Sequence, residues 1–260
     1  MTEKSDVLLS SVPVRLEPRD AVTRLGLIAL ATDLTTERDA ANLLPRDHAA
    51  LHVARIAFQN PTTPENLRRM LPRLTDTAAL LLPDEPVAAI YYACTAASVA
   101  MGDDAVISAI QAAKPGVPVV TPTAAALAAF GALGIRKVAL MTPYLPETTA
   151  PMADYFNRHG LDIVSAQCLG LEDDRDMARV SAQTIIDAAI AADRPEAEGV
   201  FLSCTGLPAL GVIETLEARL GKPVISSNQA ALWKLLSHAG LAPTARPGRI
   251  FTAMPPEQAA

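Results

Sequence analysis

The sequence predicts an α/β protein built from two similar halves, each a parallel sheet flanked by helices, with a functional cleft between them. Short apolar runs alternate with longer alanine- and leucine-rich stretches of helical spacing. The short runs are almost continuously apolar, as in parallel strands that are covered on both faces. In addition, a pattern in the first half of the chain returns in the second half.

The repeat is centred on two Cys-Thr pairs. Cys94-Thr95 follows the apolar run 88–93, and Cys204-Thr205 follows the run 199–203. After each pair a helical stretch leads to the same pattern, G-x-P-V-[VI]-[ST]-x-[TN]-x-A-A-L, at 116–127 and at 221–232. The repeated unit is too long for a solenoid and indicates a duplicated domain.

The elements follow in order from this alternation. Each expected strand is a short apolar run bounded by Gly, Pro or charged residues; these runs are 25–31, 56–57, 88–93, 117–120, 137–141, 162–166, 199–203 and 223–226. Between them, apolar residues recur at helical spacing, which predicts helices over 63–81, 98–113, 124–131, 148–159, 174–192, 208–220 and 229–239.

The domain organisation follows from where the repeat begins and ends. Residues 1–20 carry prolines and several charges, which predicts a loose arm. We expect a first domain of 21–122 together with 227–260, because the second repeat ends near residue 226 and the last helix can return to the first half. The second domain is expected over 123–226.

Composition excludes several classes of function. The 260 residues are 50% apolar with a net charge of −6 and no cluster of Lys or Arg, which argues against nucleic acid as a partner. No apolar run approaches the ~18 residues of a membrane span, and the charged N-terminus does not resemble a secretory signal. Three widely spaced cysteines predict neither a disulfide framework nor a metal site. We therefore expect a cytoplasmic protein.

The two matched cysteines are the candidate reactive groups. Ligands of parallel α/β sheets bind beyond the carboxyl ends of the strands, where Cys94 and Cys204 are expected. Each would lie near a helix N-terminus, where free amides and the helix dipole can lower a thiol pKa from ~8.5 and can also bind a carboxylate. The alternative is two buried cysteines of purely structural role; their matched positions favour a functional pair.

These residues resemble a known group of enzymes. The paired Cys-Thr motifs, the internal repeat and the motif Thr142-Pro143-Tyr144 are similar to the aspartate/glutamate racemase superfamily. The segments 24–37, 60–75 and 92–103 resemble most closely the maleate cis-trans isomerases and ectoine-utilisation protein A, in the group that also holds arylmalonate decarboxylases. This resemblance implies two Rossmann-like domains, a cleft between them, and chemistry without a cofactor or metal.

The resemblance also assigns roles to residues. It implies that Cys94 and Cys204 face each other across the substrate as the catalytic pair, and that Tyr144 and Asn228 contact the substrate. Thr95 and Thr205, with the helix amides, are then candidate donors to the charge that develops on the substrate. The alternatives are a surface-loop role for Tyr144 and a helix N-cap role for Asn228.

Asp33 departs from the maleate isomerase pattern, which has an asparagine after the first strand. A carboxylate there would repel a dicarboxylate by ~4 kcal/mol at 4 Å if the effective dielectric constant is near 20. Asp33 therefore favours a substrate with a nitrogen-bearing group over maleate itself. The alternative is a turn or N-cap aspartate.

The resulting hypothesis is a cofactor-independent two-cysteine isomerase, either a cis-trans isomerase or a racemase/epimerase. Its substrate would be a small, nitrogen-bearing carboxylate, as in ectoine or hydroxyectoine utilisation, and its assembly a homodimer or homotetramer. Two alternatives stay open. One is a decarboxylase of the arylmalonate type, a group that keeps only the cysteine of the second half. The other is a non-catalytic binding protein on the same scaffold.

Overall fold

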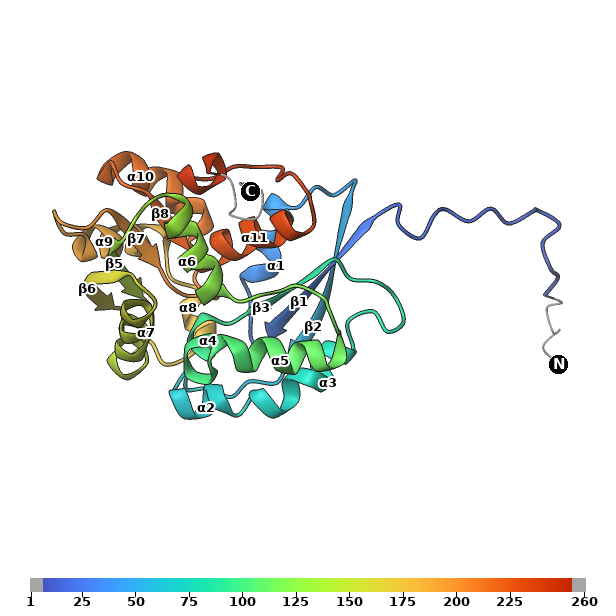
Figure 1. Cartoon of the computed structure of the whole chain (residues 1–260), viewed down its shortest axis with the longest axis horizontal. Helices are drawn as coiled ribbons and strands as arrows, with labels where there is room; N and C mark the ends of the chain where they lie inside the picture. The colour runs from blue at the N-terminus through green and yellow to red at the C-terminus, as the bar shows by residue number, and fades with distance from the viewer. Residues whose placement is uncertain (1–6, 254–260) are drawn as a thin grey trace, which may run out of the picture.

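The computed structural model describes residues 7–253 and contains two four-stranded parallel sheets. The first sheet has the order β2-β1-β3-β4 and the second the order β6-β5-β7-β8, so the two halves share one topology. Figure 1 shows the two sheets next to each other, with helices around both. The expected α/β architecture is confirmed.

The strands lie where the apolar runs predict them. Each of the eight runs overlaps a strand, but the run 56–57 shares only Ile56 with β2, which begins seven residues earlier, and only the second half of 117–120 is a strand. The strands are β1 (Thr23–Leu30), β2 (Ala49–Ile56), β3 (Ala89–Ala93), β4 (Val119–Val120), β5 (Lys137–Thr142), β6 (Asp162–Cys168), β7 (Gly199–Leu202) and β8 (Val224–Ser226).

The helices are more divided than the sequence predicts. Three stretches expected as single helices are each split into two or more helices. In addition, the sequence does not predict α1. For example, Gly102 adopts φ +86°, a conformation that L side chains rarely adopt, and this ends α4 before α5 begins. The α-helices are α1 (Thr36–Leu43), α2 (Pro64–Arg68), α3 (Leu74–Ala79), α4 (Thr95–Met101), α5 (Asp103–Ala113), α6 (Pro122–Ala132), α7 (Pro146–Arg158), α8 (Asp174–Met177), α9 (Ala182–Ala192), α10 (Ile213–Leu220) and α11 (Ser227–His238).

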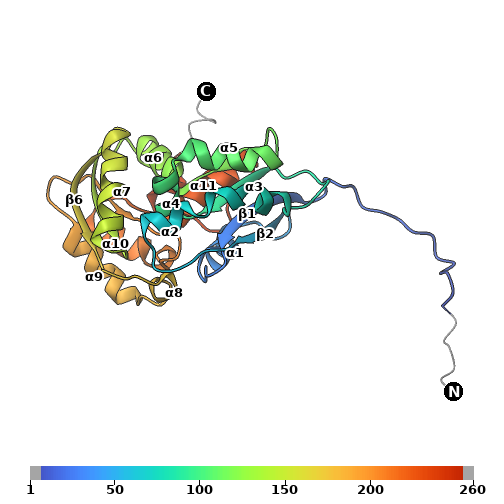
Figure 2. The ribbon, with the colours of Figure 1, turned by 90° about the horizontal axis from the view of Figure 1, so that it is seen from below.

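Helices cover both faces of each sheet. On the first sheet, α3 and α5 pack on one face and α11 on the other, beside α1. On the second sheet, α7 lies on one side, while α9 and α10 lie on the other (Figure 2). Strands buried between helices explain why their sequences are continuously apolar: every residue of β3, β7 and β8 is buried.

The chain returns to its first half after the second sheet is complete. Helix α11 follows β8 but packs against β3 and β4, and it also contacts α6 and α1. The segment after α11 continues this connection. The backbone amide of Thr244 donates to the carbonyl of Leu43, and the side-chain amide of Gln229 donates to the carbonyl of Pro247 at 2.6 Å.

The described part of the N-terminal arm leaves the body of the protein as an extended chain (Figure 1). Its large apolar side chains are exposed, including Leu9 at 102% and Leu16 at 88% of their reference areas. Among the described residues, none of the helices is long and apolar enough to cross a membrane.

Candidate active site

The carboxyl ends of β1 and β3 meet the carboxyl end of β7 around a small cavity of about 20 Å³. In each sheet the strand order reverses at this edge, which is where open α/β sheets bind their ligands. Both matched cysteines line the cavity. The lining residues are Leu30, Asp33, Leu34, Thr62, Cys94, Ala96, Tyr144, Asp174, Met177, Cys204, Thr205 and Gly206.

Cys94 occupies the position that its sequence context predicts. It follows β3 directly and is the N-cap residue of α4. The backbone amide of Ala97, in the first turn of this helix, donates a hydrogen bond to its sulfur. The first amides of a helix have no partner within it, so the amide of Ala96 offers a further donor at the cavity wall.

Cys204 does not lie at a helix N-terminus, and the helix expected over 208–220 begins only at Ile213 as α10, after a short 3₁₀ turn. The reason is that Thr205 bonds to the first half of the protein rather than capping a helix. Its hydroxyl donates to the carbonyl of Ala93 at 3.1 Å, and its carbonyl accepts from the side chain of Asn228 at 2.8 Å.

The loop that replaces the expected helix still directs donors at Cys204. The amides of Gly206 and Leu207 donate to its sulfur, and so does the hydroxyl of Tyr144. Tyr144 itself follows β5 and is 3% exposed, so it is not a surface-loop tyrosine. Three donors therefore converge on this thiol from two different strand ends.

Burial outweighs these donors in both thiols. Burial raises the pKa of Cys204 to about 11, against the lowering effect of Tyr144 and the two amides. Burial raises the pKa of Cys94 still further, because only the amide of Ala97 opposes it and the charges of Cys204, Asp174 and Asp33 add to the rise. The expected lowering of the thiol pKa is thus absent at these buried positions, and Cys204 is the easier of the two thiols to ionise.

Asp33 lines the cavity, but its carboxylate is bound to the start of α1. One oxygen accepts from the amides of Thr35 at 2.8 Å and Thr36 at 2.9 Å, and the other accepts from the Thr36 hydroxyl at 2.6 Å. These contacts match the alternative interpretation of Asp33 as a turn or capping residue.

Asn228 and Thr95 lie behind the cavity rather than among its lining residues. Asn228 is 1% exposed, donates to Asp39 at 2.8 Å and accepts from the Tyr91 hydroxyl at 2.9 Å. It is not the cap of α11 either, because Ser226 has that position. The hydroxyl of Thr95 donates to that of Ser227 at 2.8 Å. Asn228 also joins the loop after β7 to the first half of the protein, whereas the bond of Thr95 joins α4 to α11 within that half.

Asp174 is the cavity residue that the sequence does not reveal. It begins α8, is 9% exposed, and lies in the cavity with both thiols. One carboxylate oxygen accepts from Asn60 at 2.8 Å and the other from the hydroxyl of Thr32. In the sequence it belongs to the charged run EDDRD, a composition typical of a solvated turn.

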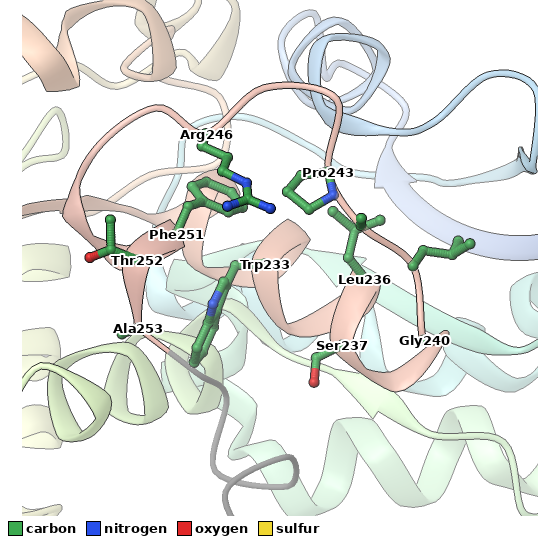
Figure 3. A pocket seen from close by; sticks show the side chains of 11 residues that line it. Trp233, Leu236, Ser237, Gly240, Pro243, Arg246, Phe251, Thr252 and Ala253 are labelled. Atoms are coloured by element: carbon green, nitrogen blue, oxygen red, sulfur yellow. The ribbon is translucent and has the colours of Figure 1, made fainter.

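A larger cavity of about 450 Å³ lies elsewhere, between α11 and the segment that follows it. Figure 3 shows Trp233, Leu236, Phe251 and Arg246 around it. None of the described residues that line it has a thiol or a carboxylate side chain, so we place the chemistry in the smaller cavity. Within residues 7–253, no group of three His, Cys, Asp or Glu side chains is arranged to hold a metal ion.

The two α/β halves meet at a cavity to which each contributes one thiol. These features define a duplicated α/β protein with its candidate active site between the two halves. The family model of arylmalonate decarboxylase matches residues 38–251. The chain is 32% identical over 223 residues to arylmalonate decarboxylase of Bordetella bronchiseptica, which covers 82% of this chain and 92% of that protein.

Maleate isomerases are also similar to this chain. That of Geobacillus stearothermophilus is 25% identical over 233 residues, covering 84% of this chain and 92% of the relative. The crystal structure of a cysteine-to-alanine variant of the maleate isomerase Iso from Pseudomonas putida S16, with maleate, superposes with a TM-score of 0.82 at 24% identity, covering 90% of this chain and 99% of that one. The chain belongs to the arylmalonate decarboxylase/maleate isomerase family of the aspartate/glutamate racemase superfamily.

The ionisation of Cys204 gives a first prediction. Because its pKa is about 11, its alkylation by iodoacetamide should keep rising about tenfold per pH unit from pH 8 to pH 10, without a plateau near the usual thiol pKa. Tyr144→Phe removes a hydrogen bond to the thiolate worth about 1.5–3 kcal/mol, which should slow alkylation about ten- to a hundredfold at a given pH. Mass spectrometry of the Cys204 peptide measures both effects.

The matched control for this variant is Tyr155→Phe, since the Tyr155 hydroxyl donates to Asp103 and does not line the cavity. A plateau below pH 9, or an unchanged rate in Tyr144→Phe, would contradict the assignment.

Asp39, the partner of Asn228, gives a prediction on stability. Burial raises the pKa of Asp39 from 3.8 to about 6, and the bond from Asn228 only partly opposes the rise. Because this pKa is higher in the folded than in the unfolded protein, Asp39 adds about 3 kcal/mol to the free energy of unfolding below pH 4. This contribution is lost as the pH rises through 6. The free energy of unfolding of Asp39→Asn, measured relative to wild type, should therefore rise by up to about 3 kcal/mol between pH 4 and pH 8.

Urea unfolding at both pH values measures this difference. Asp154→Asn, at an exposed position of α7, serves as the control and should show no such gain. If the difference between Asp39→Asn and wild type does not depend on pH, Asp39 does not titrate as a buried group.

Proposed function

We propose that this protein is a cofactor-independent isomerase that uses Cys94 and Cys204 as a pair on a small carboxylate. The observation that carries the proposal is that both thiols line one buried cavity, each at the end of the corresponding strand of its half. A purely structural role for the two cysteines would not require them to share a cavity, nor three donors to converge on one of them.

The two thiols suit two related reactions. In a racemase or epimerase, the Cys204 thiolate removes the proton next to the substrate carboxylate, and the Cys94 thiol donates its proton to the opposite face. In a cis-trans isomerase, the Cys204 thiolate adds to one carbon of the double bond, the Cys94 thiol serves as its protonated partner, and the electron pair moves into the carboxylate. The remaining single bond then rotates, and the thiolate leaves as the double bond re-forms.

Both reactions place negative charge on the substrate carboxylate, which needs hydrogen-bond donors. The backbone amide of Ala96, at the start of α4 and among the lining residues, is a suitable donor because it has no partner within the helix, whereas the Tyr144 hydroxyl already donates to Cys204. The assignment of Cys204 as the thiolate follows from its lower pKa and its three donors.

Without a substrate, the Cys204 side chain is almost entirely protonated at pH 7. With a pKa of about 11, ionising Cys204 at pH 7 costs roughly 5 kcal/mol. The cavity also holds only about one water molecule and must widen to admit a substrate. Substrate entry, which must widen the cavity and change the surroundings of Cys204, is therefore the step at which the reactive thiolate can form.

Decarboxylation is the second candidate, favoured by the family model and by the 32% identity to arylmalonate decarboxylase. Such a reaction needs only one thiol as the proton donor after carbon dioxide leaves. The retention of Cys94 is the feature that favours isomerisation over this alternative.

Replacement of the thiols tests the proposal. Cys94→Ser and Cys204→Ser should each reduce turnover of an isomerisable substrate by about a thousandfold or more, because each removes an essential acid, base or nucleophile. Cys168→Ser, in which the third cysteine lies at the end of β6 outside the cavity, is the matched control and should stay near wild type. Near-normal turnover in either serine variant would exclude the two-thiol reaction.

The type of reaction can be read from the same assays. Solvent deuterium in recovered substrate indicates proton abstraction, whereas cis-trans conversion without deuterium indicates thiol addition. Carbon dioxide release from an arylmalonate that persists in Cys94→Gly would support the decarboxylase.

A role in ectoine or hydroxyectoine utilisation rests on the similarity of three sequence segments, and the genes that neighbour this one test it.

We also propose that the protein forms a homo-oligomer. The exposed apolar side chains of the N-terminal arm support this, since an extended segment with Leu8, Leu9 and Leu16 in water is more stable when covered. Replacing these three leucines with serine should lower the molar mass measured by light scattering while leaving the circular dichroism of the body unchanged. An unchanged mass, or a monomeric wild type, would contradict the proposal.

A further inference from the structure

The cavity has an unusual balance of charge for a site that binds a carboxylate. Its twelve lining residues include two carboxylates, Asp33 and Asp174, and no Lys, Arg or His. Nearby cations are paired elsewhere: Arg175 bonds to Asp173, and Arg55 bonds to Glu37. A substrate carboxylate can be held by backbone amides, but none of the described residues that line the cavity offers a cationic side chain for a second one.

Of the two carboxylates, Asp174 is the one free to contact a substrate. Its two oxygens accept one hydrogen bond each, from Asn60 and Thr32, and an ionised carboxylate can accept about four. Asp33, by comparison, already accepts three bonds from the start of α1.

Asp174 is also held firmly in place. Its backbone amide donates to Oδ1 of Asn60 at 3.2 Å, while Nδ2 of the same asparagine donates to its carboxylate at 2.8 Å. This reciprocal pair joins the carboxylate to the loop after β2 in the other half of the protein. The negative charge therefore faces both thiols and Tyr144, and it contributes to the raised pKa of all three.

A dicarboxylate in this cavity would bring its second negative charge close to Asp174. A substrate with a protonated nitrogen would instead place N–H donors against the free acceptor positions of Asp174, as a charge-assisted hydrogen bond. The same cation would favour the neighbouring thiolate, because an opposite charge nearby favours the ionised form.

We propose that Asp174 makes this cavity selective for a monocarboxylate that carries a protonated nitrogen, an amino or amidinium acid, over a dicarboxylate. This inference rests on the proposed function, since it names the substrate class of the same two-thiol site.

Thiol reagents of opposite charge test this selectivity without any turnover. The rates at which Cys204 reacts with 2-aminoethyl methanethiosulfonate and with 2-sulfonatoethyl methanethiosulfonate are measured by mass spectrometry. Each rate constant is divided by the rate constant of the same reagent with 2-mercaptoethanol, a small neutral thiol, in solution. This division removes the difference in intrinsic reactivity between the two reagents. In wild type we expect the normalised ratio of cationic to anionic reagent to be about ten or more. A ratio near or below one overturns the inference without reference to any variant.

The variants then assign the selectivity to one residue. Asp174→Asn should lower the normalised ratio about tenfold. Asp176→Asn removes the same charge two residues away on α8, from an exposed side chain that bonds to Arg179 and does not line the cavity, and should leave the ratio unchanged. Equal effects of the two variants would overturn the role of Asp174, since the protein's overall charge would then explain both.

The outcome is separable from that of the proposed function. Normal turnover in the two serine variants would overturn the two-thiol reaction and would leave the reagent ratio, and the cation-selective cavity, intact. Conversely, loss of turnover in those variants together with a ratio near one would keep the isomerase and exclude the amino or amidinium acid.

Discussion

The relative position of the two thiols depends on the hydrogen bonds of one buried amide, that of Asn228. This side chain donates to Asp39 and to the carbonyl of Thr205, and it accepts from Tyr91. It thereby joins α11, α1, β3 and the loop that carries Cys204. A buried polar group without its partner costs about 1–3 kcal/mol, so these bonds favour a single arrangement of the seam. The cavity exists because that arrangement brings two strand ends together.

The enclosure that positions the thiols also opposes their ionisation. Burial raises the pKa of both thiols, and the hydrogen-bond donors at Cys204 only partly oppose this rise. In such a low-dielectric cavity, one additional charge has a larger effect than it would have in water. The family of this chain includes members named for decarboxylation and for isomerisation, and the charges around a shared pair of strand ends are a simple means by which such activities can diverge.

Most of the scaffold could be predicted from the sequence, because buried parallel strands are continuously apolar and a duplicated pattern marks corresponding strand ends. The two cysteines could be placed at strand ends from local sequence, whereas Tyr144 is assigned to the site only through the resemblance to maleate isomerases. Helix α1 could not, because its sequence TERDAANL is mostly polar and the bonds to Asp33 and Asn228 hold it in place. Asp174 could not either, because only contacts with Thr32 and Asn60, more than a hundred residues away, bring it into the cavity.

The duplication is not perfect where it matters most: Cys94 starts a helix, whereas Cys204 precedes a loop. The two faces of a bound substrate would therefore meet thiols of unequal acidity. If the reaction interconverts mirror images, its equilibrium constant is one, and the specificity constants of the forward and reverse directions must be equal. The inequality of the thiols can then be expressed only as compensating differences in kcat and KM, so that one enantiomer would bind more tightly and turn over more slowly than the other.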